Sequence, residues 1–271
     1  MPRVAFQGER GAYSEMAALQ YFPKTKLVPC KSFADAFLAA EKKQVDYAVI
    51  PVENSIEGSV GEANDLLLQT RLKAVGEVYQ RVRHCLIVNK GVKIGDVRHA
   101  YSHPQALGQC RQYLQKKKIE PMPAYDTAGA VKMVKEQGGK DAAIASRRAA
   151  ELYGMKILQE GIEDRKSNYT RFLVLAPAKA AKAKGQYKTS MIFSVKHVPG
   201  ALFGILGEFA IRRLNLTKIE SRPTKETPWE YNFYVDFEGH VDDKAVRQVM
   251  KIVRAKTSYL KVLGSYRKAE F

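Results

Sequence analysis

The segment PAKAAKAKGQYK, residues 177–188, separates two regions of the chain in which strands and helices follow different orders. It is rich in alanine and lysine and has no apolar face, which is typical of a linker. The chain of 271 residues is also longer than most single domains. We therefore predict a first region over residues 1–177, a linker over residues 178–188 and a second region over residues 189–271.

The first region alternates strands with helices. The predicted strands are VAFQ, DYAVIPV, HCLIV, HAYS, AAIA and FLVL. The predicted helices are residues 14–22, SFADAFLAAEK, EANDLLLQT, QALGQCRQYLQ, a helix that begins at Thr127, and SRRAAELYG. Ser32 and Asp35 predict a variant of the capping box at the start of the second of these helices. Repeated alternation is typical of an α/β architecture with largely parallel sheets.

The second region has its own order of elements. It runs through the strand SMIFSVKH, the helix GALFGILGEFAIRRL, the strands LTKIESRP and YNFYVDFEG, the helix DKAVRQVMKIVRA and the strand YLKVLGSY. This βαββαβ order predicts a ferredoxin-like fold.

Composition excludes several classes of protein. No run of about 18 apolar residues occurs, so we expect no membrane span. The N-terminus lacks the pattern of a secretory signal, which predicts a cytoplasmic location. Cys30, Cys85 and Cys110 are far apart and predict neither a disulfide framework nor a zinc site. The net charge of +17 favours an anionic partner, but no basic block of five or more residues occurs, so we expect no nucleic acid.

Polar clusters follow several of the predicted strands, where ligands gather in open α/β sheets. They are GERGAYSE (8–15), PVENSIEGS (51–59), YSHPQALGQC (101–110) and NYTRF (168–172). Taken singly, each has a structural explanation: Ser14 and Ser102 can cap helices, Asn54 can form an Asx turn, and Thr170 can be a satisfied hydroxyl. Four clusters of uncharged hydrogen-bonding groups together indicate a cleft for a polar small molecule.

These motifs, with AAIAS, PGAL and ESRP further along, resemble prephenate dehydratases in order and spacing over nearly the whole chain. The resemblance implies two α/β lobes around a cleft, like type II periplasmic-binding proteins, followed by an ACT domain. It also implies the conversion of prephenate to phenylpyruvate, with loss of water and carbon dioxide and without a metal or organic cofactor. Glu9 and Ala12 depart from many relatives and, with PVENSIEGSV, also resemble arogenate dehydratases.

The resemblance further implies roles for particular residues. Thr170 is expected at the leaving hydroxyl, as a hydrogen-bond donor or relay because it is too weak an acid to protonate that group freely. Asn54, Ser102 and Gln109 are expected as neutral donors. Arg171, a fixed cation with a planar fork, is expected to hold the pyruvyl carboxylate. The remaining residues expected on the substrate side are Phe172, Ser14, Glu53 and Ser55.

The family also uses PGAL and ESRP at an effector site between subunits. L-Phenylalanine is therefore expected as a feedback inhibitor, bound by Gly200, Ala201, Leu202, Glu220, Ser221, Arg222 and Pro223. The ACT resemblance implies a homodimer or homotetramer. Two other functions stay open: an arogenate dehydratase, and a non-catalytic amino-acid sensor built from the same two parts.

Overall fold

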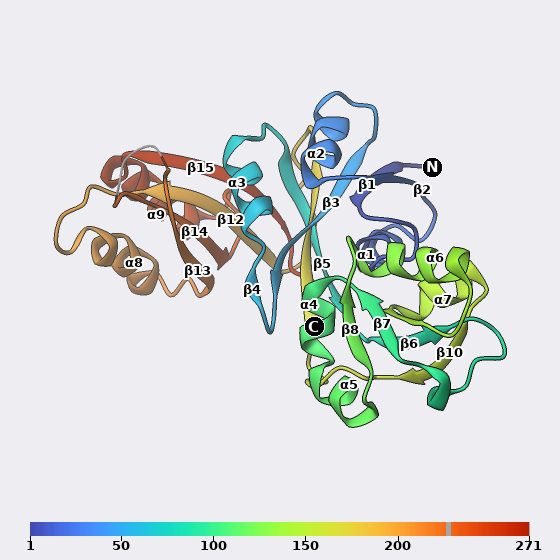
Figure 1. The fold of residues 1–271 in the computed structure, drawn as a ribbon. Coiled ribbons are helices and arrows are strands. Elements are labelled where there is room, and N and C mark those ends of the chain that lie inside the picture. Colours follow the sequence, from blue (N-terminus) through green and yellow to red (C-terminus); the bar gives the residue numbers. More distant parts are fainter. Residues whose placement is uncertain (226–228, 271) are drawn as a thin grey trace. The chain divides into compact units, whose positions relative to one another are not determined.

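The computed structural model describes residues 1–225 and 229–270 (Figure 1). The described chain forms two compact units, of which the first contains residues 1–64 and 78–172 and the second contains residues 65–77 and 173–271. Within the described residues, no helix has the length and apolar character needed to cross a bilayer. Two strands, β5 (Lys73–Arg81) and β11 (Tyr169–Ala176), continue from one unit into the other.

The first sheet has the order β2-β1-β3-β11-β5, with the short β4 beside β3, and β1 runs parallel to both β2 and β3. Its elements are β1 (Arg3–Gln7), α1 (Tyr13–Tyr21), β2 (Lys26–Cys30), α2 (Phe33–Glu41), β3 (Tyr47–Asn54), β4 (Gly58–Ser59) and α3 (Gly61–Gln69). Strand β3 is buried along most of its length, as its run of apolar residues predicts. The strand therefore delivers its last residue, Asn54, from the middle of the sheet.

The second sheet has the order β10-β6-β9-β7-β8. Its elements are β6 (Cys85–Val88), the short 3-10 helix η1 (Ile94–Asp96), β7 (His99–Ser102), α4 (Pro104–Gln109), α5 (Arg111–Lys117), β8 (Glu120–Pro123), α6 (Thr127–Gln137), β9 (Ala142–Ala145), α7 (Arg147–Tyr153) and β10 (Lys156–Glu160). The two sheets follow the same scheme: β2-β1-β3-β11-β5 in the first corresponds to β8-β7-β9-β6-β10 in the second. In each sheet the fourth strand of this order, β11 or β6, is the one that arrives from the other lobe. This repeated scheme confirms two α/β lobes of the type II binding-protein plan.

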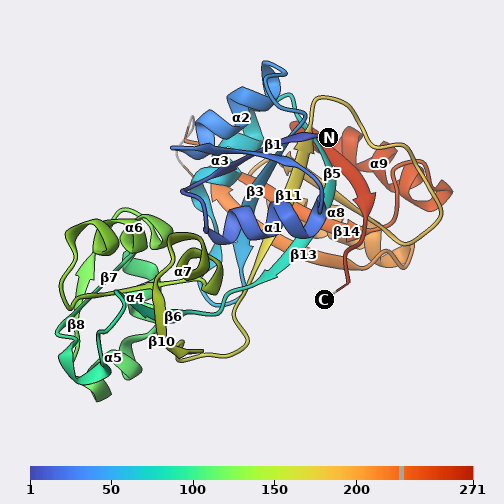
Figure 2. The ribbon, with the colours of Figure 1, turned by 90° about the vertical axis from the view of Figure 1, so that its right-hand side faces the viewer.

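Helices cover both faces of the second sheet, with α6 and α7 on one side and α5 on the other (Figure 2). Strand β6 shows why, because its side chains alternate between two apolar clusters. Leu86 and Val88 pack with α4 and α5, whereas Cys85 and Ile87 pack with α6 and α7. All four residues of β6 are buried, as expected for a strand with a helical layer on each face.

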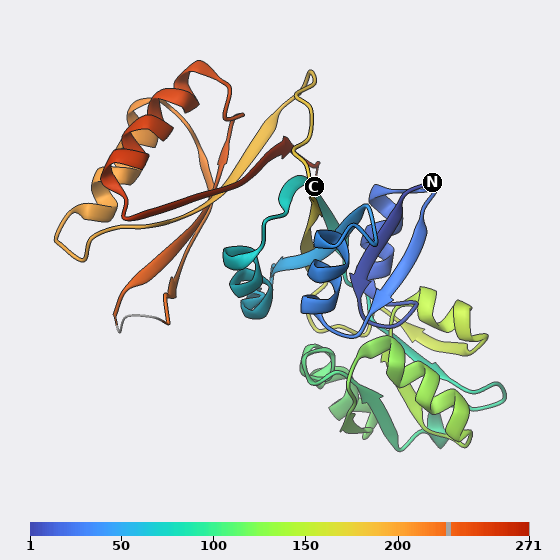
Figure 3. The same ribbon diagram turned by 90° about the horizontal axis from the view of Figure 1, so that it is seen from above.

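The second unit contains β12 (Tyr187–Ser194), α8 (Ala201–Ile211), β13 (Leu216–Pro223), β14 (Tyr231–Glu238), α9 (Lys244–Lys256) and β15 (Tyr259–Arg267). Its antiparallel sheet has the order β13-β14-β12-β15. Helices α8 and α9 lie side by side on one face of this sheet (Figure 3). The predicted βαββαβ order and ferredoxin-like fold are confirmed.

Several local predictions were tested by the structure. The capping box of Ser32 and Asp35 is present. Ser14 is not a helix cap, because α1 begins after Ala12, and Ser102 is not one either, because His103 caps α4. The helix predicted over QALGQCRQYLQ is two helices that meet at Cys110. The predicted linker is irregular through Gln186, and its last two residues belong to β12.

Candidate active site

The side-chain amide of Asn54 is the centre of a polar cluster in the first unit. Its Nδ2 donates to Oγ1 of Thr170 (3.0 Å), to Oδ1 of Asn168 (2.8 Å) and to the carbonyl of Tyr169 (3.2 Å). Asn54 ends β3 and Tyr169 begins β11, which is the neighbouring strand in the sheet. Strand order therefore brings together two polar groups that lie 116 residues apart in the sequence.

The carbonyl oxygen of the Asn54 side chain fixes the orientation of this amide. Oδ1 accepts hydrogen bonds from the backbone N–H groups of Ile56 (2.9 Å) and Glu57 (3.0 Å), which is the predicted Asx turn. Because Oδ1 receives two donors, the other end of the amide must be the NH₂ group that faces Thr170. The hydroxyl of Thr170 is thus the acceptor in this contact, and its own proton is left for another partner.

Ser55 joins the loop after β3 to the start of β11. Its hydroxyl donates to the carbonyl of Ser167 (2.9 Å) and accepts from the backbone N–H of Tyr169 (2.9 Å). The backbone N–H of Ser55 also donates to the carbonyl of Tyr169 (2.8 Å). Ser55 therefore holds Asn54 beside Thr170, and its predicted contact with a substrate stays a prediction.

Gln109 extends the cluster into the second lobe. Its Oε1 accepts from Nδ2 of Asn168 (2.8 Å) and lies 3.0 Å from Nε2 of His84. Its Nε2 donates to Oε1 of Glu57 at 3.3 Å. An amide on a helix that otherwise faces a core needs such partners, and here they come from both lobes.

His84 is 2% exposed and lies behind Gln109. Nδ1 of its ring is 3.2 Å from the hydroxyl of Tyr13, and its backbone N–H donates to Oε2 of Glu163 (2.9 Å). Burial lowers the pKa of His84, although the hydrogen bond to Gln109 and the charge of Glu163 act in the opposite direction. Burial also raises the pKa of Tyr13. The imidazole of His84 and the phenol of Tyr13 are therefore uncharged at neutral pH.

Sequence reasoning did not select His84, Asn168 or Glu163. A signal for Asn168 was present in the sequence, because it belongs to the polar cluster NYTRF and stands two residues before Thr170. Nothing comparable marks His84 or Glu163, because their roles depend on contacts with residues far away in the sequence.

A cavity of about 290 Å³ opens beside Gln109. It is lined by Ile56, Glu57, Gly108, Gln109, Glu163, Asp164 and Arg165. Three of these side chains are carboxylates and one is a guanidinium, so the lining carries more negative than positive charge.

The other predicted substrate residues are more enclosed. Arg171 is 5% exposed, and its Nη1 lies 3.6 Å from Oε2 of Glu53. Phe172 is 1% exposed and lies in the core, while Ser14 is buried within α1. The hydroxyl of Ser102 is fully buried and donates to the carbonyl of Ile144 (2.6 Å). Roles for these residues in binding or catalysis stay predictions.

The predicted effector residues lie at two places in the second unit. Gly200 caps α8 with a φ of 78°, and Ala201 and Leu202 line a cavity of about 360 Å³ whose walls also include Pro199, Trp229 and Phe233. Glu220, Ser221, Arg222 and Pro223 end β13, where Nη2 of Arg222 pairs with Oδ1 of Asp65 (3.2 Å). Desolvation opposes ionisation of Asp65, but hydrogen bonds from Lys225 and Arg222 outweigh it and lower the pKa of this carboxyl.

Metal chemistry has no obvious site in the described chain. No group of three or more His, Cys, Asp or Glu side chains within residues 1–225 and 229–270 is arranged to hold a metal ion. The polar cluster consists of amides, hydroxyls and a neutral imidazole, with the carboxylates of Glu57 and Glu163 beside them.

Fold and site together define a two-lobed α/β protein with a small-molecule cleft and an appended ferredoxin-like module. The family model for prephenate dehydratase matches residues 4–180, and that for the ACT domain matches residues 189–255. The chain belongs to the prephenate dehydratase family.

Known relatives cover almost the whole chain. Arogenate dehydratase/prephenate dehydratase 2 of Arabidopsis thaliana is 45% identical over 97% of this chain and 72% of its own length. The structure of prephenate dehydratase from Arthrobacter aurescens in complex with L-Phe is 29% identical, with a TM-score of 0.91 over 98% of this chain and 90% of that one. A structure described as GqqA, a novel type of quorum quenching acylases, is 34% identical, with a TM-score of 0.91 over 99% of both chains.

Proposed function

We propose that this protein is a prephenate dehydratase, which converts prephenate to phenylpyruvate, water and carbon dioxide. The observation that carries the proposal is the hydrogen bond from Nδ2 of Asn54 to Oγ1 of Thr170. It leaves the hydroxyl proton of Thr170 for another partner, in a polar cluster that reaches through Gln109 to a cavity for a small molecule. Membership of the prephenate dehydratase family supports the same reaction.

The reaction requires few chemical groups from the protein. The bond between the ring and its carboxylate breaks, and its electron pair completes the aromatic ring while the carbon–oxygen bond to the hydroxyl breaks. One proton is needed for the departing oxygen to leave as water. Thr170, which accepts from Asn54, donates toward that oxygen and so stabilises the charge that develops on it.

The departing carboxylate must not be held tightly. A close ion pair would stabilise its charge and oppose the release of its electrons, whereas a site poor in water favours the release. In this structure the buried Arg171 lies near Glu53, which partly offsets its charge. We assign Arg171 to the pyruvyl carboxylate, which takes no part in bond breaking.

A second candidate substrate is arogenate, which carries an ammonium group where prephenate has a keto oxygen. The observation in its favour is Glu57, a carboxylate that lines the cavity and accepts from Nε2 of Gln109. A carboxylate at this position would pair with an ammonium but would repel additional negative charge. The first relative named above carries both activities in its name.

The likeness to a quorum quenching acylase suggests a third chemistry. Acyl transfer by a hydroxyl needs a base that removes its proton. The group against Thr170 is the NH₂ of Asn54, which donates and cannot accept a proton. The geometry of the cluster therefore favours the dehydratase over an acylase.

Feedback inhibition by L-phenylalanine is part of the proposal. Helix α8 presents its first N–H groups beside Gly200, where an amino-acid carboxylate is stabilised, and the neighbouring cavity has apolar walls for an aromatic ring. The A. aurescens relative was solved with L-Phe bound. The dimer or tetramer and the cytoplasmic location stay predictions.

The decisive experiment is a side-by-side assay of the purified protein with prephenate and with arogenate at neutral pH. Formation of phenylpyruvate well above a buffer control supports the proposal. A far higher kcat/KM with arogenate than with prephenate would show that arogenate is the preferred substrate. No turnover of either compound would favour the amino-acid sensor.

A further inference from the structure

A cavity of the second unit has no part in the proposed reaction or in the predicted effector site. It measures about 850 Å³ and is called the cationic pocket below. It is lined by Lys73, Ala74, Lys179, Ala180, Lys182, His240, Val241, Asp242, Arg247, Met250, Lys251, Arg254, Leu260, Lys261, Val262, Gly264 and Ser265. None of the seven predicted effector residues belongs to this lining.

The lining carries seven lysines and arginines against one acidic residue, Asp242. Three of the cations, Arg247, Lys251 and Arg254, recur on one side of α9 at intervals of four and three residues. Like charges at this spacing repel one another and destabilise a helix. Such repulsion is relieved when an anion binds between them.

Two of the seven cations already have partners. Nζ of Lys182 pairs with Oδ1 of Asp243 at 2.6 Å. Nζ of Lys261 donates to three carbonyls at the end of α3, those of Leu67, Leu68 and Thr70 (2.9, 2.7 and 2.5 Å). Within residues 1–225 and 229–270, no ion pair or hydrogen bond engages the side chains of the other five, which are Lys73, Lys179, Arg247, Lys251 and Arg254.

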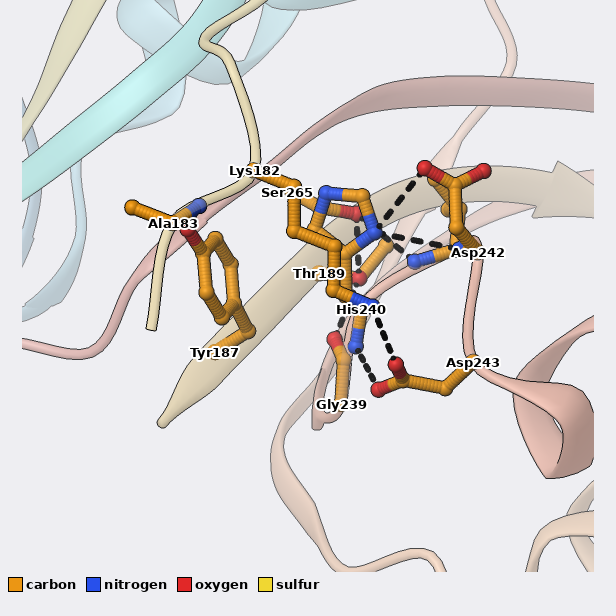
Figure 4. A network of polar contacts seen from close by, with 10 residues as sticks. Lys182, Ala183, Tyr187, Thr189, Gly239, His240, Asp242, Asp243 and Ser265 are labelled. Atoms are coloured by element: carbon orange, nitrogen blue, oxygen red, sulfur yellow. Dashed lines mark hydrogen bonds and ion pairs between the residues drawn. The ribbon is translucent and has the colours of Figure 1, made fainter. Parts of the chain in front are cut away.

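One wall of the pocket is held rigid by a polar network (Figure 4). The backbone N–H of His240 donates to Oδ2 of Asp243 (2.8 Å), and that of Val241 donates to Oγ of Ser265 (3.1 Å). Oγ of Ser265 also lies 2.7 Å from Oγ1 of Thr189. The loop after β14 is thereby fixed to β12 and β15 before any ligand arrives, which reduces the entropy cost of binding.

The linker also contributes to this wall. The backbone N–H of Ala183 donates to the hydroxyl of Tyr187 (2.6 Å), whose ring meets the ring of His240 edge to face. Together with the pair of Lys182 and Asp243, these contacts hold the linker beside the loop after β14. Lys179, three residues before Lys182, is thereby brought to the same pocket.

We propose that the cationic pocket binds a small molecule that carries two or three linked phosphates, such as a nucleoside triphosphate. Two phosphates carry roughly three to four negative charges. This charge balances that of the five cations named above far better than the single charge of a carboxylate does. Met250, Leu260 and Val262 give the pocket an apolar side on which a base can lie. Its concave form and volume suit a compact ligand rather than a nucleic-acid strand.

The test is calorimetric titration of the full chain with tripolyphosphate, with ATP and with adenosine, at neutral pH and about 0.15 M salt. We expect saturable binding of tripolyphosphate and of ATP, and no binding of adenosine alone. Tighter binding of ATP than of tripolyphosphate would assign the apolar side to a nucleoside, and equal binding would assign the site to phosphates alone.

Matched variants on α9 locate the site. Arg247→Gln and Lys251→Gln each remove one pocket cation and are expected to weaken tripolyphosphate binding about tenfold. Lys244→Gln removes the same charge from the exposed start of the same helix, outside the pocket, and is expected to change binding less than about twofold.

Three outcomes would overturn the proposal. The first is that neither phosphate compound shows saturable binding. The second is an equal loss of binding in all three variants, which would indicate a diffuse charge effect. The third is tighter binding of a single-stranded RNA than of ATP, weakened by Lys251→Gln, which would make the surface a nucleic-acid site.

Discussion

Oγ1 of Thr170 lies 3.0 Å from Nδ2 of Asn54, and the amide is the donor in this hydrogen bond. The direction is fixed by the two backbone N–H groups, of Ile56 and Glu57, that occupy the other end of the amide. The hydroxyl of Thr170 is therefore polarised by one neighbour and keeps its own proton for a different partner. This relationship gives two predictions about the chemical step.

The first prediction concerns the hydroxyl itself. Thr170→Ala is expected to lower kcat at least about 100-fold while KM changes by no more than a few-fold, because the lost contact matters mainly in the transition state. Thr170→Ser should keep part of the rate. Steady-state kinetics with prephenate measures both, and Thr25→Ala, which removes a hydroxyl bonded to the carbonyl of Pro2, is the control. Full activity of Thr170→Ala would remove Thr170 from the mechanism.

The second prediction concerns the direction of the hydrogen bond. Asn54→Asp keeps the size of the side chain and the oxygen that accepts from Ile56 and Glu57, but replaces the donor with a carboxylate. Thr170 would then donate its proton to the carboxylate, so kcat is expected to fall at least about 100-fold. Circular dichroism should show an unchanged fold. An active Asn54→Asp variant would mean that the proton of Thr170 is not needed.

The third prediction concerns the choice between prephenate and arogenate. If Glu57 binds the ammonium group of arogenate, Glu57→Gln should lower kcat/KM for arogenate about tenfold or more, with little loss for prephenate. Glu62→Gln, which neutralises an exposed carboxylate on α3, is the matched control. Equal effects of Glu57→Gln on both substrates would rule out Glu57 as the discriminating group.

Much of the fold and part of the site could be predicted from the sequence. Apolar alternation and capping residues are local signals, and they gave both sheets, most helices and the ferredoxin-like module. The strands β2, β4, β5, β8 and β10 were missed. Of these, β2, β5, β8 and β10 lie at sheet edges, and β2, β8 and β10 are only partly buried, so their apolar patterns are weak.

The site was predicted as a set of strand ends but not as a network. Thr170, Asn54 and Gln109 do meet, through Asn168, because strand order is a property of the fold that their spacing alone does not contain. Burial of His84 and the carboxylates around the cavity depend on packing between segments that are distant in the sequence. For this reason, the charged groups that line the cleft could not be predicted from the sequence.

The fourth prediction concerns pH. Burial holds the pKa of His84 below its ordinary value. Near pH 6.5 the imidazole of His84 therefore binds a proton in the unfolded chain but stays neutral in the folded chain. The unfolded state then binds more protons, and stability rises with pH in that window. The contribution of neutral His84 to the free energy of unfolding is present above about pH 6.5 and is lost as the pH falls toward the pKa of His84 in the folded chain.

Urea unfolding followed by circular dichroism at about pH 7.5 and about pH 5.5 measures this effect. The free energy of unfolding should fall more between these values in the wild type than in His84→Gln, which keeps a polar side chain but cannot titrate. Parallel pH dependences in the two proteins would show that His84 titrates alike in the folded and unfolded states.

The fifth prediction concerns inhibition by L-phenylalanine, and it rests on the geometry at the start of α8. Gly200 has a φ of 78°, a left-handed conformation that a β-branched residue adopts at a cost of about 1–2 kcal/mol. Apart from the two neighbours in the chain, no heavy atom of residues 1–225 and 229–270 lies within 4 Å of the position that a Cβ would take, so a valine there meets strain and occupies the space before the helix. The first intrahelical bond runs from the N–H of Gly204 to the carbonyl of Gly200 (2.8 Å), which leaves the N–H groups of Leu202 and Phe203 for a carboxylate.

Gly200→Val is therefore expected to raise the phenylalanine concentration for half-inhibition about tenfold or more, since typical allosteric couplings are about 1–3 kcal/mol. Turnover without phenylalanine should stay within about twofold, because Gly200 lies outside the polar cluster of the first unit. Gly91→Val is the matched control: Gly91 has a φ of 91° and open space around it, but lies in an exposed turn of the first unit. If both valine variants lose inhibition equally, general strain is the cause. If wild-type activity is unaffected by millimolar phenylalanine, the end of α8 binds no inhibitor and this regulatory role is wrong.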